Sequence, residues 1–168
     1  MRKIISILLL LSFLITLSGC NKTDIEEGIK FYYCSYEDTY GTTQGLFVTE
    51  MRVLSCDAND YETIIQEFLN GPREKECFTP FPAGTVLEDY QFENGYTTIV
   101  LSPQMAQQTN ANVLVSCACL CMTLFSFSSI QTIEIRIADK FINGEEKLVF
   151  TRNSFLIHDD SSFRITDN

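Results

Sequence analysis

The stretch VLEDYQFENGYTTIVLSP, residues 86–103, decides the fold. Val86–Phe92 and Tyr96–Leu101 are rich in aromatic and β-branched residues, a composition typical of strands. Asn94-Gly95 lies between them, and this dipeptide suits the type I′ turn that joins two strands into a hairpin. Ser102-Pro103 ends the second strand, because proline cannot donate to a strand ladder. The stretch therefore predicts a β-hairpin near the middle of the chain.

After this hairpin the sequence predicts a helix and two more strands. Thr109 or Asn110 can cap a helix that carries the nearly continuous apolar run Val113–Phe127. Thr132–Ile137 alternates strictly, which indicates a strand with one buried face. The residues of that face are Ile133, Ile135 and Ile137, and those of the other are Thr132, Glu134 and Arg136. Asn143-Gly144 is a second hairpin signal and leads to a last strand at Lys147–Thr151.

Before the hairpin the sequence predicts two strands and one helix. The strands are Ile29–Tyr36 and Leu46–Ser55, separated by a loop at Gly41–Gly45. Asp60 is the favoured cap of a helix that Gly71-Pro72 ends. Its apolar residues recur at helical spacing and are Ile64, Ile65, Phe68 and Leu69. The order β-β-α-β-β-α-β-β predicts a small α+β domain, in which two helices pack on one face of a mixed or antiparallel sheet.

The first residues have the pattern of a secretory signal. Arg2 and Lys3 precede an apolar run, Ile4–Leu17, which is shorter than the roughly 20 residues that a membrane-spanning helix needs. Leu17-Ser18-Gly19-Cys20 resembles the bacterial lipobox, whose cysteine sulfur takes a diacylglycerol and becomes the new N-terminus. We expect cleavage before Cys20, lipidation of Cys20 and anchoring at the extracytoplasmic face of a membrane. The alternative is an ordinary signal peptide that contains a cysteine.

Four segments follow from these signals. We expect a lipoprotein signal peptide at residues 1–19, a lipidated cysteine and tether at 20–28, an α+β domain at 29–157 and a flexible tail at 158–168. The chain has a formal net charge of −10. Nucleic-acid binding depends on neutralising phosphates with lysine and arginine, so this acidity argues against it. Anionic lipid head groups would also repel the domain, and attachment is expected to come from the acyl chains.

Several stretches of the domain, taken together, resemble the GerMN domain, a module of spore-germination and sporulation lipoproteins. They are Glu67–Pro72 (EFLNGP), Phe81–Thr85 (FPAGT), Thr98–Ser102 (TIVLS), Thr123-Leu124 and Ile133–Lys140 (IEIRIADK). They occur in the family's order between about Ile29 and Phe150. The resemblance implies a fold related to ring-building motifs, which are small α+β units of multi-subunit rings. It does not imply an enzyme or a cofactor.

The cysteines offer the strongest candidate chemistry. Cys117 and Cys121 lie one helical turn apart and could share a soft metal, but zinc would need about two further ligands. His158 is the only histidine and lies in the predicted tail. We favour the alternative that Cys117, Cys119 and Cys121 are small core residues where helix and sheet come close. A disulfide between Cys34 or Cys56 and a helix cysteine stays open, and Cys77 completes the six cysteines of the domain.

Other candidate sites are weaker. Acidic residues at Asp57, Asp60 and Glu62, or at Asp159 and Asp160, could suggest calcium, but the sequence has no Asp-x-Asp-x-Asp-Gly loop. It also lacks a Gly-x-Ser-x-Gly motif and a phosphate-binding glycine loop. A lone histidine removes the most common general base. No catalytic, cofactor-binding or metal-binding residue is therefore predicted.

Aromatic residues gather near the first strand and the proline-rich connector. They are Phe31, Tyr32, Tyr33, Tyr36, Tyr40, Phe78 and Phe81. Core packing is the favoured interpretation, and anchoring of a protein interface is the alternative. The sequence as a whole predicts a non-enzymatic, membrane-anchored lipoprotein that binds an envelope protein or copies of itself, in sporulation or spore germination. The alternative is an envelope lipoprotein that binds a small ligand, and a cell-wall enzyme ranks third.

Overall fold

The structure is a computed structural model that describes residues 28–35, 47–57, 59–142, 144–157 and 163–165. The helices are α2 (Tyr61–Leu69) and α3 (Asn110–Phe125), with short 3-10 turns η1 (Pro103–Gln107) and η2 (Arg152–Ser154). The strands are β1 (Ile29–Ser35), β2 (Phe47–Arg52), β3 (Cys77–Phe78), β4 (Leu87–Glu93), β5 (Tyr96–Leu101), β6 (Thr132–Ile137), β7 (Leu148–Thr151), β8 (Phe155–Ile157) and β9 (Phe163–Ile165). The predicted α+β class is confirmed.

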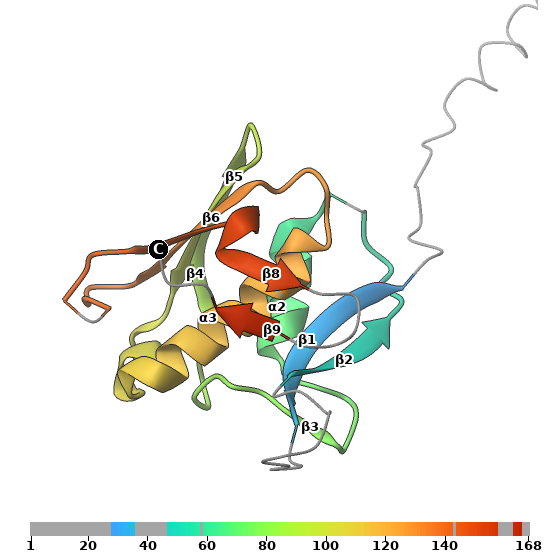
Figure 1. Cartoon of the computed structure of the whole chain (residues 1–168), viewed down its shortest axis with the longest axis horizontal. Helices are drawn as coiled ribbons and strands as arrows, with labels where there is room; N and C mark the ends of the chain where they lie inside the picture. Colours follow the sequence, from blue (N-terminus) through green and yellow to red (C-terminus); the bar gives the residue numbers. More distant parts are fainter. Residues whose placement is uncertain (1–27, 36–46, 58, 143, 158–162, 166–168) are drawn as a thin grey trace, which may run out of the picture.

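The strands form two main sheets (Figure 1). The larger has the order β4-β5-β6-β7, with β5 and β6 parallel and the outer pairs antiparallel, so it is mixed. Parallel strands need a long crossover, and α3 supplies it. The smaller sheet, β2-β1-β3, is antiparallel, and β8 pairs with β9. The sequence predicted one sheet, whereas the first two strands pair with β3 in a sheet of their own.

Helix α3 lies in the centre of the molecule. Every residue from Ser116 to Phe125 is buried, because the four-stranded sheet lies on one side of the helix and β1 on the other. The backbone N–H of Tyr32 in β1 donates to Oγ1 of Thr123 in α3 at 3.0 Å. The helix thus satisfies a strand donor in the place where a further strand would lie. A helix that is apolar on all faces is expected in such a position.

Helix α2 packs beside α3 against β4. Tyr61 of α2 meets Phe92 of β4 edge to face, with ring centroids 5.0 Å apart. The predicted buried face of β6 is confirmed, since Ile133 and Ile135 are fully buried and Ile137 nearly so. The four-stranded sheet therefore has an inner face covered by both helices, as the sequence predicted, and an outer face turned away from them.

Most local signals of the sequence are confirmed. Asp60 caps α2, because its Oδ1 accepts from the backbone N–H of Thr63 at 3.1 Å. Asn94 and Gly95 have φ angles of 51° and 81°, as a type I′ turn requires. Thr109 is the cap of α3, which ends at Phe125 rather than Phe127. The two-residue strand β3 was not predicted, because it is too short to show an alternating pattern.

The second predicted hairpin also forms, and β6 and β7 pair antiparallel. A bridge between Ile142 and Glu145 closes the turn around Gly144, whose φ is +86°. The described residues contain no helix that is both long enough and apolar enough to cross a bilayer.

Candidate interaction surface

The outer face of the four-stranded sheet carries the side chains that alternate with the core positions. On β5 these are Tyr96, Thr98 and Val100; on β6 they are Thr132, Glu134 and Arg136; on β7 they include Val149. Thr98 lies opposite Glu134, and Glu134 lies opposite Val149, so these residues form one continuous row across three strands. Tyr96 and Val149 are 39% and 48% exposed. We call this set the outer sheet face.

A compact ionic cluster lies at the centre of the outer sheet face. Glu134 accepts hydrogen bonds from the Tyr96 hydroxyl at 2.6 Å, from Arg136 Nε at 2.6 Å and from Lys147 Nζ at 2.7 Å. Burial alone would raise the pKa of Glu134, but these donors outweigh burial and lower the pKa to about 2. The carboxylate is therefore ionised at neutral pH and cannot act as a general base near pH 7.

The donors around Glu134 remain open to solvent although Glu134 itself is covered. Arg136 and Lys147 have side chains that are 40% and 46% exposed. The fixed carboxylate holds their charges in place, while a large part of each side chain stays in contact with solvent. Because aromatic and arginine side chains are enriched at protein interfaces, Tyr96 and Arg136 suit this arrangement. The cluster can hold charged and aromatic side chains in place for binding a partner, and it is not suited to catalysis.

The two edges of the four-stranded sheet differ. Edge strand β4 exposes Glu88, Asp89 and Glu93, and such charges discourage a further strand from pairing. Edge strand β7, Leu148–Thr151, carries no charged residue. Strand addition is therefore more favourable at β7, next to the outer sheet face, than at β4.

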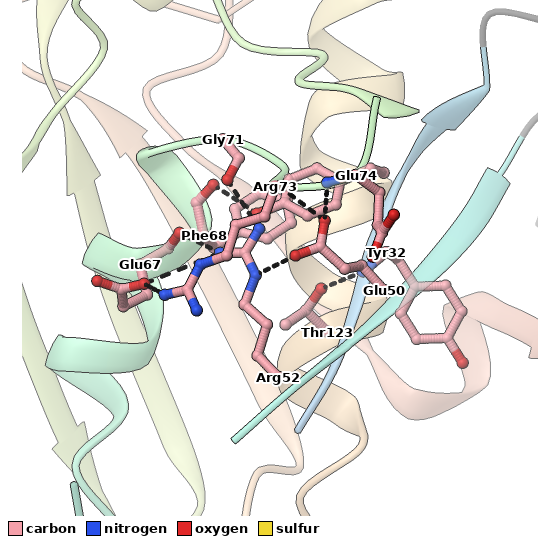
Figure 2. A network of polar contacts seen from close by, with 10 residues as sticks. Tyr32, Glu50, Arg52, Glu67, Phe68, Gly71, Arg73, Glu74 and Thr123 are labelled. Carbon is pink, nitrogen blue, oxygen red and sulfur yellow. Dashed lines mark hydrogen bonds and ion pairs between the residues drawn. The ribbon is translucent and has the colours of Figure 1, made fainter. Parts of the chain in front are cut away.

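A second polar network joins β2 to the end of α2 (Figure 2). Arg52 Nε donates to Glu50 Oε1 at 2.5 Å, and the other guanidinium nitrogens donate to the carbonyls of Glu67 at 2.9 Å and Gly71 at 2.8 Å. The guanidinium also lies over the ring of Phe31, 4.6 Å from its centroid. Carbonyls at a helix C-terminus lack intrahelical partners, and Arg52 supplies them.

Glu50 completes this network on its other side. Its Oε2 accepts from the backbone N–H groups of Arg73 at 2.9 Å and Glu74 at 3.2 Å. Burial alone would raise the pKa of Glu50, but the bonds from Arg52 and these two amides lower it on balance. The network fixes the Glu67–Pro72 stretch on which the family resemblance depends (Figure 2). Because Arg52 and Glu50 are both buried, the network serves the fold rather than a partner.

The cysteines lie in the core, with Cys56 partly exposed. Cys34, Cys77, Cys117, Cys119 and Cys121 are buried, and all six described cysteines are free thiols. Burial raises the pKa of Cys117 to about 12, so its thiol is unreactive. Within the described ranges, no group of three or more His, Cys, Asp or Glu side chains is placed to hold a metal ion. Cys34 Sγ lies 4.0 Å from Cys119 Sγ, which is the pairing of a strand and a helix cysteine that the sequence left open.

The aromatic residues near β1 divide between core and surface. Phe31, Tyr33 and Phe81 are buried against Phe68, the first two by stacking and Phe81 edge to face, so they are core residues. Tyr32 and Phe78 are half-buried. The exposed aromatic residue of the outer sheet face, Tyr96, was not singled out from the sequence. Its place in the row Tyr96, Thr98, Val100, which alternates with Thr97, Ile99 and Leu101, was the signal that could have found it.

Other predicted positions have local roles or lie outside the described residues. Asp60 caps α2 with both carboxylate oxygens, and Asp57 accepts from the backbone N–H of Asn59 at 3.0 Å. These acids thus act in turn and helix capping. Cys20, Tyr36, Tyr40, His158, Asp159 and Asp160 lie outside the described residues.

A pocket of about 650 Å³ opens between β3, the proline-rich connector and the start of α3. Its lining includes Cys34, Phe78, Phe81, Gln108 and Val115. The Gln108 side-chain amide donates to the Pro80 carbonyl at 2.6 Å. The pocket is thus walled by apolar and aromatic side chains with a few amide groups at its rim, as small-molecule sites often are.

Known structures share this fold. The chain is similar to the first GerMN domain of the sporulation protein GerM from Bacillus subtilis, with a TM-score of 0.56 and 16% identity over 75% of this chain and 98% of that one. It is also similar to the tandem GerMN domains of the same protein, with a TM-score of 0.51 and 19% identity, over 72% of this chain and 43% of that one. No curated protein matches the chain.

The family itself is shown by sequence. A family model described as "Germane: Sporulation and spore germination" matches residues 30–143, which is more than half of the chain. This range contains the two described helices, strands β2 to β6 and all of β1 except Ile29. The resemblance to the GerMN domain is thereby confirmed, and the chain belongs to the Germane family of sporulation and spore germination proteins.

Proposed function

We propose that this chain is a non-enzymatic assembly module, anchored by a lipid on Cys20 at the extracytoplasmic face of a membrane. It binds an envelope protein, or copies of itself, through the outer sheet face. The observation that carries this proposal is the exposed side chains of Tyr96, Arg136 and Val149 around the fixed carboxylate of Glu134 on the outer sheet face. Membership of a sporulation and germination family supports a role in one of those processes.

The chemistry of the described residues favours binding over catalysis. Glu134 is held ionised by three donors, so it neither gives nor takes a proton near neutral pH. The thiols of Cys117 and Cys121 are buried, and burial raises the pKa of both. In the Arg52 network, the arginine donates to backbone carbonyls and Glu50 accepts from backbone amides of the same chain. The outer sheet face, by contrast, keeps donors and apolar side chains exposed.

Site-specific crosslinking tests the docking surface. A photo-crosslinking residue replaces Val149 on the outer sheet face, and in the matched control it replaces Leu114, which is similarly exposed on α3. We expect a discrete crosslinked product, identified by mass spectrometry, from position 149 and not from position 114. Growing cells are compared with starved cells. Equal capture from both positions, or none from position 149, would overturn the proposal.

The anchor needs its own test. Replacing Cys20 with serine removes the only thiol of the Leu17–Cys20 stretch. We expect the chain to move from the membrane fraction to the soluble extracytoplasmic fraction, and labelled fatty acid to be absent from it. A variant that stays in the membrane would show that Cys20 is not the anchor.

The pocket beside α3 supports a second candidate function, capture of a small ligand. The lining of Phe78, Phe81 and Val115, with the amide of Gln108, is suited to a partly apolar molecule. A ligand that binds only the native state at 100 times its Kd would stabilise it by about 2.7 kcal/mol. A soluble peptidoglycan fragment is the first probe, and a rise in Tm that Val115→Trp abolishes would favour this function.

A further inference from the structure

Cys34 and Cys119 come from different parts of the fold and meet side by side. Cys34 is in β1 and Cys119 is in the middle of α3, 85 residues apart in the sequence, yet their Sγ atoms are 4.0 Å apart. Tyr32 and Thr123 make the next contact between the same two elements, with the Tyr32 N–H donating to the Thr123 hydroxyl at 3.0 Å. Two successive contacts thus hold β1 against α3 and fix the position of the two thiols.

The two thiols differ from the other helix cysteines in access. Cys34 lines the pocket between β3 and the start of α3, and although it is only 2% exposed it is the one of the two that borders this open space. Cys119 is fully buried behind Cys34. Cys117 and Cys121 are buried as well, and neither lines that pocket. The geometry therefore gives one thiol at the wall of the pocket and one internal partner.

Their shared contact also separates their acidities. The hydrogen bond with Cys119 lowers the pKa of the Cys34 thiol, although burial opposes this. The same bond, together with burial, raises the pKa of Cys119. Because the thiolate is the attacking form in thiol–disulfide exchange, Cys34 is the better nucleophile and Cys119 the better second thiol.

We propose that Cys34 and Cys119 form a redox-active dithiol that a disulfide oxidant entering the pocket converts to a Cys34–Cys119 disulfide. The Cys34 thiolate attacks one sulfur of the oxidant, the oxidant's S–S bond breaks, and one thiolate leaves and takes up a proton. Cys119 then gives its proton to the second departing thiolate and attacks the Cys34 sulfur. The two cysteines are oxidised by two electrons, and one oxidant disulfide is reduced to two thiols.

Little movement separates the two states. The sulfurs must approach from 4.0 Å to about 2.05 Å, the length of a disulfide bond. The resulting bond would tie the three-stranded sheet to the central helix. Cross-linking positions so far apart in the sequence removes much freedom from the unfolded chain, and we expect the Tm to rise by roughly 10 °C.

The test uses the full-length chain, purified in detergent with its thiols reduced and then treated with oxidised glutathione. We expect the loss of two hydrogen masses and, after proteolysis, a peptide that links Cys34 to Cys119. Cys119→Ala should instead retain one glutathione on Cys34, because no second thiol can release it. The matched control is the double variant Cys117→Ala and Cys121→Ala, which should still form the link.

Peptide mapping of the unmodified chain decides the matter even if a variant fails to fold. A link between another pair of cysteines, or free thiols at both Cys34 and Cys119 after treatment, would overturn the proposal. Loss of the link in the Cys117 and Cys121 double variant, with its circular dichroism unchanged, would also overturn it. This inference does not depend on the outer sheet face, so its failure and the failure of the docking proposal are distinguishable.

Discussion

Two strands of this molecule carry the same Glu-x-Arg pattern, in which the glutamate is buried in both but the arginine is buried in only one. Glu50 and Arg52 lie on β2, and Glu134 and Arg136 lie on β6. In both, the arginine Nε donates to the glutamate two residues before it, at 2.5 Å and 2.6 Å. Arg52 is only 3% exposed, whereas the Arg136 side chain is 40% exposed. The local geometry is therefore the same, and burial decides what each pair does.

The buried pair has partners on every side. Arg52 also reaches the carbonyls of Glu67 and Gly71, and Glu50 also accepts from two backbone amides. Ions removed from water need such extra bonds to offset their desolvation. The pair on β6 has Lys147 and Tyr96 as further partners of the glutamate, and Arg136 and Lys147 stay in contact with water. The pair on β2 thus fastens the end of α2 to the strand, while the pair on β6 leaves charged groups exposed on the outer sheet face.

The largest expected effect comes from breaking the buried pair. Arg52→Met keeps most of the side-chain volume but removes the donor to Glu50 Oε1 and to the carbonyls of Glu67 and Gly71. We expect a loss of about 3–5 kcal/mol in the free energy of unfolding, measured by urea denaturation. Arg136→Met on β6 is the matched control and should move the urea midpoint far less. Equal losses in the two variants would show that burial does not separate the pairs.

A smaller effect is expected where a buried hydroxyl is removed, and its size should depend on whether that hydroxyl makes a hydrogen bond. Thr123→Val removes the hydroxyl that accepts from the Tyr32 N–H, and a buried amide without an acceptor costs about 1–2 kcal/mol. Thr97 offers the same substitution in a different setting, because its buried hydroxyl has no hydrogen-bond partner among the described residues. Thr97→Val should therefore be neutral or stabilising. Thermal unfolding of both variants measures the contrast, and a similar loss in each would contradict it.

Local sequence signals predict the helices, strands and turns of this chain better than the way in which they pack together. The type I′ turn at Asn94-Gly95, the Asp60 cap and the alternation of Thr132–Ile137 are local signals, and each is confirmed. The pairing of β1 with the two-residue strand β3 depends on contacts between distant segments, which no local pattern encodes. The same limit applies to Arg52, whose acceptors at Glu67 and Gly71 follow it by 15 and 19 residues.

The candidate surface was predictable only in part. The alternation of β6 predicted that Glu134 and Arg136 lie on the opposite face from Ile133, Ile135 and Ile137, and the structure confirms this. It did not reveal that Tyr96 and Lys147 converge on Glu134, because that depends on the register of three strands. The pairing of Cys34 with a helix cysteine was one of several open alternatives until the fold brought Cys119 beside it.

The next prediction concerns the pH dependence of the pair on β6. The folded pKa of Glu134, about 2, lies below its ordinary value of 4.5, so the ionised carboxylate stabilises the fold above pH 4.5. This contribution is lost as the pH falls from 4.5 toward 2. Allowing for screening by water, we expect Glu134→Gln to cost about 1 kcal/mol at pH 7.

Urea titrations of wild type and Glu134→Gln from pH 7 to pH 2 check this. The difference between the two chains should shrink toward zero at the acidic end. Subtracting the two curves removes the part due to Glu50, whose pKa is also lowered and which both chains retain. A difference that stays constant down to pH 2 would mean that the charge of Glu134 is not the source.

Val149→Lys should have the smallest effect on stability and the largest effect on binding. Val149 lies opposite Glu134 on the exposed side of β7, so Val149→Lys disturbs no core contact and should change the free energy of unfolding by less than about 0.5 kcal/mol. With a photo-crosslinking residue at Thr98 on the same face, this variant should lose most of the crosslinked product. Leu114→Lys on α3 is the matched control and should retain it.

If Val149→Lys leaves crosslinking intact, the outer sheet face around Val149 does not contact the partner, and the edges of the sheet become the better candidates. If both lysine variants abolish it, added charge rather than the outer sheet face is responsible.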